Sequence, residues 1–106
     1  HSELNTARAN AVIRKGSNPL IDSYSAFFEN DRKTPTGLNG YFRSLEIEKI
    51  NLVGLVTDFC VNYSAQDAAK LGYKVSVFES MCRSIDINGS LALARTEMRE
   101  CGVELI

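Results

Sequence analysis

The chain has 106 residues, with 12 Lys and Arg against 13 Asp and Glu, so its formal net charge is −1 at pH 7. That length suits one domain, and the balanced charge gives no electrostatic reason to expect a nucleic acid or an anionic membrane as partner. The longest uncharged apolar stretch, residues 52–57, is far shorter than the ~20 residues of a membrane span.

The first third of the chain predicts a strand followed by a long loop. Residues 11–15 are short, apolar and β-branched, end in Lys15 and are stopped by Gly16, which is typical of a buried strand running into a loop. Residues 16–37 are rich in Gly, Pro, Asn and Asp, and their middle, residues 23–28, is aromatic. Long loops of this kind are more often functional than decorative.

The next two segments predict a helix and then a strand. Residues 38–47 predict a short helix, because four apolar side chains recur at helical spacing on one face: Leu38, Tyr41, Phe42 and Leu45. Residues 49–56 are a nearly continuous apolar run. Such a run is typical of a central strand of a parallel sheet that is covered on both faces.

Residues 60–71 predict a helix that begins at a cysteine and lies close to the sheet. Thr57 or Asp58 can cap this helix, and Gly72 has the place of the glycine that ends one. Its apolar stripe contains two alanines, which would permit a close approach to a sheet. The stripe consists of Val61, Ala65, Ala68 and Leu71.

The last third continues the alternation of strands and helices. Residues 73–78 predict a strand, residues 79–89 a loop, residues 90–101 a helix ended by Gly102, and residues 103–106 a final strand. The stripe of this helix consists of Leu91, Ala94, Met98 and Cys101. Alternating strands and helices predict an α/β fold with a parallel sheet and right-handed connections.

Two polar groups follow predicted strands, where ligands bind in open parallel sheets. Lys15 ends the first strand, and Cys60 starts the helix after residues 49–56. The helix dipole and the unpaired backbone N–H groups there would stabilise a thiolate and could also hold an oxyanion. From the residues alone, a structural cysteine, a solvated lysine and a disordered terminal His1 are the more common interpretations, and Asp58 is expected to cap a helix rather than to act as an acid.

The other two cysteines, Cys82 and Cys101, are far from Cys60 and from each other in the chain. Three cysteines at such spacings form neither a disulfide framework nor a CxxC motif. We expect Cys82 and Cys101 to be structural side chains in a reducing, cytoplasmic compartment.

The segment around Cys60 resembles a known enzyme family. Residues 53–61, Val-Gly-Leu-Val-Thr-Asp-Phe-Cys-Val, followed by Ala-Gln-Asp-Ala at 65–68, are similar to the nucleophile segment of the isochorismatase-like cysteine hydrolases. Within that superfamily the chain is most similar to the nicotinamidases, also called pyrazinamidases. The resemblance covers essentially the whole chain and includes four further segments: residues 15–16, 22–27, 83–86 and 97–103.

The resemblance implies a three-layer isochorismatase-like fold and a set of site residues. Cys60 would be the nucleophile and Lys15 its electrostatic partner, while the backbone N–H groups of Val56 and Cys60 would form the oxyanion hole after a cis Leu55–Val56 peptide bond. Tyr24 and Val56 would contact the substrate. His1 would be a ligand of a divalent metal ion, zinc or else iron or manganese.

The resemblance also implies an activity. It predicts hydrolysis of nicotinamide to nicotinate and ammonia through a cysteine thioester, in salvage of NAD, with pyrazinamide as a further substrate. In the family, an aspartate and the remaining metal ligands precede the counterpart of His1. We therefore expect residues 1–106 to be the C-terminal part of a single domain and to be inactive alone. A homo-oligomer is the assembly we consider for the whole protein. Two alternatives stay open: another amidohydrolase of the superfamily, or a catalytically incomplete α/β module.

Overall fold

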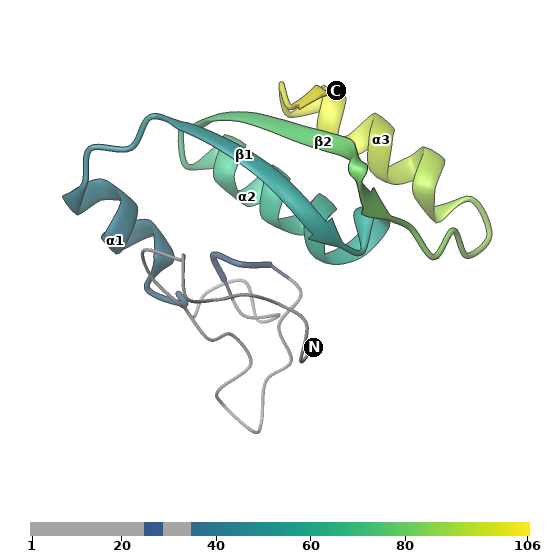
Figure 1. Ribbon diagram of the computed structural model, residues 1–106, viewed down its shortest axis with the longest axis horizontal. Helices are drawn as coiled ribbons and strands as arrows, with labels where there is room; N and C mark the ends of the chain where they lie inside the picture. Colours follow the sequence, from purple (N-terminus) through teal and green to yellow (C-terminus); the bar gives the residue numbers. More distant parts are fainter. Residues whose placement is uncertain (1–24, 29–34) are drawn as a thin grey trace.

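The computed structural model describes residues 25–28 and 35–106. Their elements, in chain order, are α1 (Leu38–Ser44), β1 (Lys49–Leu55), η1 (Thr57–Val61), α2 (Asn62–Lys70), β2 (Lys74–Arg83), α3 (Ser90–Glu100) and β3 (Glu104–Leu105). The three strands form one parallel sheet in the order β1-β2-β3 (Figure 1). The predicted α/β fold with a parallel sheet is therefore confirmed. The strand predicted at residues 11–15 lies outside the described residues.

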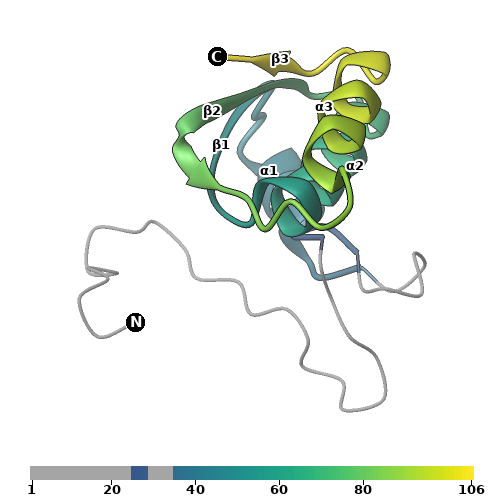
Figure 2. The ribbon, with the colours of Figure 1, turned by 90° about the vertical axis from the view of Figure 1, so that its right-hand side faces the viewer.

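The described sheet carries its helices on one face. Figure 2 shows β1 and β2 on one side of the fold and α2 and α3 on the other. Ile50 of β1 faces the core, whereas Val53 and Leu55 are 52% and 69% exposed. Within the described ranges β1 pairs with β2 alone. The prediction of a central strand covered on both faces also concerns residues outside these ranges and stays a prediction. A continuous apolar run does not by itself say which faces are covered.

Strand β2 continues five residues beyond its predicted end at residue 78. Val77 pairs with Leu52 and Cys82 pairs with Gly54, so residues 78–81 bulge out between two paired parts of the strand. The bulge interrupts the alternation of buried and exposed side chains. This interruption is why residues 79–83, predicted to be a loop, belong to the strand.

Helices α2 and α3 confirm both predictions made for their ends. Gly72, with φ of 98°, follows α2, and Gly102, with φ of 86°, follows α3. The N–H of Gly72 donates to the Ala69 carbonyl and the N–H of Tyr73 to the Ala68 carbonyl, each at 3.1 Å. These are the two bonds of a Schellman motif, which a left-handed glycine completes without a Cβ clash. Ala65 and Ala68 are fully buried against the sheet, as their size predicts.

Helix α1 is shorter than predicted. It ends at Ser44, and Glu46 takes a left-handed φ of 58°. Leu45, predicted to lie on the buried face, is 54% exposed. Phe42 still packs on the core, with its ring centroid 6.0 Å from that of Tyr73. The helical spacing therefore predicted which side of α1 packs on the core. It placed the end of the helix at residue 47, whereas the helix ends at Ser44.

Candidate active site

The cysteine singled out by the sequence lies where the carboxyl end of β1 meets the following helix. Cys60 is in η1, the turn between β1 and α2. The peptide bond between Leu55 and Val56 is cis, as the family resemblance implied. Cys60 is partly exposed, and its thiol is free. The predicted position of Cys60, beyond a parallel strand and in the first helical turn, is confirmed.

The turn that carries Cys60 is wider than an α-helical turn. The N–H of Val61 donates to the carbonyl of Val56, five residues earlier, at 3.0 Å, so η1 is a π-helical turn. Such turns are rare and are frequent at functional sites. The turn begins after Val56, which has extended backbone, and no side chain caps it. The prediction that Thr57 or Asp58 caps this helix is wrong.

Asp58 bonds across the fold instead. Its carboxylate is buried and accepts hydrogen bonds from the Ser90 hydroxyl at 2.5 Å and from the backbone N–H groups of Asp86 at 2.7 Å and Ile85 at 3.1 Å. Burial alone raises the pKa of the Asp58 carboxyl, but the hydrogen bond from Ser90 and those from the backbone outweigh it and hold the pKa below its ordinary value. Asp58 is therefore a charged carboxylate with three donors.

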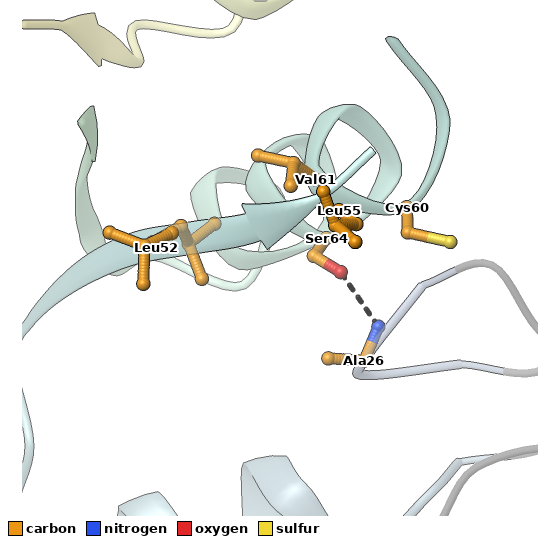
Figure 3. A pocket seen from close by; sticks show the side chains of 7 residues that line it. Ala26, Leu52, Leu55, Cys60, Val61 and Ser64 are labelled. Carbon is orange, nitrogen blue, oxygen red and sulfur yellow. Dashed lines mark hydrogen bonds between the residues drawn. The ribbon is translucent and has the colours of Figure 1, made fainter. Parts of the chain in front are cut away.

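A small pocket of about 180 Å³ opens beside Cys60. In Figure 3 the thiol stands at the opposite end of this pocket from Leu52. Apart from the Cys60 thiol and the Ser64 hydroxyl, the lining is apolar. It consists of Ala26, Leu52, Val53, Leu55, Cys60, Val61 and Ser64. The arrangement places a nucleophilic atom at the edge of an apolar space that suits a small planar molecule.

The segment 25–28 closes one side of this pocket and is held at Ala26. The Ala26 N–H donates to Ser64 Oγ at 2.8 Å (Figure 3), and the Ala26 carbonyl accepts the Thr36 hydroxyl at 2.5 Å. Phe27, the next residue, is 1% exposed and stacks near Tyr73. Phe27 thus belongs to the core, and it is Ala26 that lines the pocket.

Sequence reasoning missed Ser64 and Ala26. Ser64 follows Cys60 by four residues, a spacing that puts two side chains on the same side of a helix. That spacing is the signal by which Ser64 could have been found. Ala26 carries no such signal, because its place depends on a hydrogen bond to a residue 38 positions away.

Three predicted site residues lie outside the described residues: Lys15, Tyr24 and His1. The roles implied for them therefore stay predictions. The other two cysteines are described: Cys82 is buried in β2 and donates to the Phe78 carbonyl at 3.4 Å, while Cys101 lies 3.9 Å from Gln66 Oε1. Neither lines the pocket. In the described ranges, the helices are too short or too polar to cross a membrane.

Comparison with known proteins agrees with the geometry. Residues 2–106 match the model of the isochorismatase domain family. The nicotinamidase of Acinetobacter baylyi is 47% identical over 106 residues, which are the whole of this chain and 50% of that protein. The solved nicotinamidase/pyrazinamidase of Acinetobacter baumanii is 48% identical with a TM-score of 0.95, covering all of this chain and 51% of that one.

A second solved structure carries a ligand. PnC1 of L. infantum in complex with nicotinate is 37% identical with a TM-score of 0.91, covering all of this chain and 52% of that one. The chain thus spans about half the length of the curated relatives it matches. Because the family model covers residues 2–106, which is nearly the whole chain, the chain belongs to the isochorismatase domain family.

Proposed function

We propose that this chain carries the nucleophile of a nicotinamidase, which hydrolyses nicotinamide to nicotinate and ammonia, and that residues 1–106 are the C-terminal part of a single hydrolase domain. The observation that carries the proposal is the free, partly exposed Cys60 thiol at the mouth of an apolar pocket. The 47% identity to a bacterial nicotinamidase supports the choice of substrate. Pyrazinamide, a similar planar ring amide, is proposed as a second substrate.

In the proposed mechanism the Cys60 sulfur attacks the carboxamide carbon of the substrate. The thiol gives up its proton, and the tetrahedral oxyanion is held by the backbone N–H groups of Val56 and Cys60, each worth about 3–4 kcal/mol. The leaving nitrogen takes up the proton that the thiol gave to its acceptor, so the intermediate expels ammonia and leaves an acyl thioester on Cys60. Water then hydrolyses the thioester, which releases the carboxylate and restores the thiol. Lys15 is proposed to favour the thiolate, and an aspartate from an earlier segment of the family's fold to accept the proton.

The pocket supports a small aromatic amide. Its apolar lining favours a pyridine ring, and its volume of about 180 Å³ lies below the 300–1,000 Å³ of pockets for drug-sized ligands. Val56 immediately precedes η1, and we propose that Val56 and Tyr24 lie against the ring.

A divalent metal ion, zinc or else iron or manganese, is part of the proposal for the whole enzyme, with His1 as one ligand. Imidazole suits these ions, and the metal would orient the ring nitrogen of the substrate. The part of the chain that the structure describes contains no group of three or more His, Cys, Asp or Glu side chains that could hold such an ion. The metal site stays a prediction. A cytoplasmic location, a role in NAD salvage and homo-oligomer formation likewise stay predictions.

The decisive experiment replaces the nucleophile in the full-length protein. Cys60→Ala is expected to lower the rate of ammonia release from nicotinamide by about 10³-fold or more, because it removes the sulfur that forms the acyl intermediate. The folded state is expected to survive, since Cys60 is partly exposed. Ammonia release is measured by a coupled assay, and folding by circular dichroism.

Cys101→Ala is the matched control, because it removes a partly exposed cysteine that does not line the pocket. It is expected to leave the rate unchanged. Near-normal turnover by Cys60→Ala would place the nucleophile elsewhere. Activity on another acyl amide with none on nicotinamide would favour the second candidate, a different amidohydrolase of the superfamily.

A further inference from the structure

The buried carboxylate of Asp58 is a charged group that the proposed mechanism does not use. Asp58 is 3% exposed and lies in η1, two residues before Cys60. Its Oδ2 accepts the Ser90 hydroxyl at 2.5 Å and the Asp86 N–H at 2.7 Å, and its Oδ1 accepts the Ile85 N–H at 3.1 Å. A buried charge with three donors is tightly held, because each hydrogen bond to an ionised group is stronger than a neutral one.

The segment 85–90 is shaped to present these donors. Asp86 and Asn88 take left-handed φ values of 54° and 53°, and Gly89 one of 84°. Asp and Asn tolerate this region better than other side chains do. In such a turn successive backbone N–H groups converge on one point and bind an anion. The anion here is a side chain of the turn that carries the nucleophile.

Ser90 completes the contact from the start of α3. Its hydroxyl donates to Asp58 and at the same time accepts the Ile87 N–H at 2.8 Å. The element η1 also packs directly against α3. Together Asp58, Ser90 and the two backbone N–H groups form a clamp between η1 and residues 85–90.

Asp58 acts on the reaction only through this clamp. It is not among the residues that line the pocket beside Cys60, so a substrate in that pocket would not touch it. What the clamp restrains is the path of the backbone from Thr57 to Val61, which carries the Cys60 thiol and one of the N–H groups assigned to the oxyanion hole.

Resting on the proposed function, we propose that Asp58 is a positioning residue for amide hydrolysis. Its carboxylate ties η1 to residues 85–90 and thereby keeps the Cys60 thiol and the oxyanion-hole N–H groups in the geometry of attack. The physical reason is that a displacement of about 1 Å at reacting atoms can cost on the order of 100-fold in rate. The π-helical turn begins without a side-chain cap, and the Asp58 carboxylate supplies a side-chain restraint from within the turn.

The test variant is Asp58→Asn in the full-length protein. An asparagine has one acceptor oxygen and one NH₂ group, whereas both carboxylate oxygens of Asp58 accept a backbone N–H. In either orientation the new NH₂ group therefore meets an N–H donor, and the clamp opens on one side. We expect kcat for nicotinamide to fall by about 10- to 100-fold, with KM within about twofold of wild type, because substrate contacts are unchanged.

Asp86→Asn is the matched control. The Asp86 side chain is exposed and accepts one bond, from the Leu91 N–H at 3.3 Å through Oδ1. An asparagine carbonyl can accept that bond without conflict, and it tolerates the left-handed backbone equally well. The Asp86 N–H that binds Asp58 remains. We expect kcat and KM of this variant to match wild type.

Two further measurements distinguish a positioning role of Asp58 from a purely structural role. Cys82 is 4% exposed in β2, so its protection from iodoacetamide, measured by peptide mass spectrometry, reports whether the core stays closed in the variant. Ser90→Ala removes one of the three donors to Asp58, together with the acceptor of the Ile87 N–H, and is expected to lower kcat by a smaller factor, again without raising KM. If Asp58→Asn does not fold, Ser90→Ala serves as the test variant in its place.

Each kinetic outcome supports or overturns either the positioning role of Asp58 or the proposed function. A lower kcat in folded protein that still protects Cys82 supports the positioning role. A kcat that is unchanged, or that falls only in proportion to the loss of folded protein, overturns it, as does a rise in KM at constant kcat. A wild-type protein that hydrolyses no amide overturns the proposed function itself, whereas an active wild type with unaffected Asp58 and Ser90 variants overturns the positioning role alone.

Discussion

The two long helices of the described fold differ in how they are buried. In α2, which follows the nucleophile turn, six of nine residues are buried: Asn62, Ser64, Ala65, Gln66, Asp67 and Ala68. In α3, Ala94 and Met98 are the only two buried residues among eleven. Helix α2 contacts β2 on one side and α3 on another, and it binds Ala26 through Ser64. Helix α3 is an outer helix with a single buried stripe.

The difference shows that burial around this site is partly polar. In α2 the Gln66 side-chain amide donates to Asn62 Oδ1 at 2.8 Å inside the fold. In α3 the corresponding bond, from the Thr96 hydroxyl to the Ala92 carbonyl at 3.1 Å, is exposed. Within the described ranges no buried side-chain nitrogen or oxygen lacks a partner. Helix α2 therefore buries polar side chains that are hydrogen-bonded, in addition to its apolar contacts. One of these side chains, Ser64, bonds to Ala26 beside the pocket.

The sharpest probe of this comparison is Met98, one of the two buried residues of α3. Met98 is fully buried, and Met98→Ala is expected to lower the free energy of unfolding by about 2–5 kcal/mol, because it removes a core side chain and leaves a cavity. Leu93→Ala, on the same helix but 61% exposed, is expected to cost about 0.5 kcal/mol or less. Urea unfolding measures both, and equal costs would contradict the single buried stripe of α3.

A smaller effect tests the polar burial of α2. Asn62→Ala removes the acceptor of the Gln66 amide, and a buried unsatisfied donor costs about 1–3 kcal/mol. Thr96→Ala is the control, since it removes a side-chain bond at the same helical spacing on the exposed face of α3. Its cost is expected to lie below that of Asn62→Ala in the same urea titration. The comparison fails if the control costs as much.

The smallest effect is expected at the ion pair between α3 and β2. Arg95 Nε lies 2.7 Å from Glu79 Oε1, and the two side chains are 41% and 26% exposed. Arg95→Gln is expected to cost about 0.2–1 kcal/mol, because exposed pairs are screened by water. The difference should shrink further in high salt. A larger, salt-independent loss in the unfolding free energy would mean that α3 is held by more than its apolar stripe.

Local patterns predicted most of the fold. The glycines at 72 and 102, the small residues Ala65 and Ala68, and the alternation of strands with helices all have the roles their patterns indicated. The errors share one physical cause. The bulge in β2 and the early end of α1 each depend on neighbouring elements, which a pattern within one segment does not contain.

For the candidate site, too, local motifs predicted some features, and others depend on contacts between distant elements. The position of Cys60 after a parallel strand, and the cis bond before Val56, followed from one short motif and its resemblance to a family. The functions implied for Lys15, Tyr24 and His1 rest on that resemblance as predictions. The contacts that hold the pocket and the nucleophile turn were not predicted, and Asp58 was expected to be a helix cap.

What the sequence determined by itself was the order of the elements and the place of Cys60 in the first helical turn after β1, because both are written in neighbouring residues. Only the tertiary structure decided the partners of Asp58 and Ser64. Those partners are 27 to 38 positions away in the chain. A hydrogen bond over that separation depends on how the strands pair and the helices pack, and no local periodicity records it.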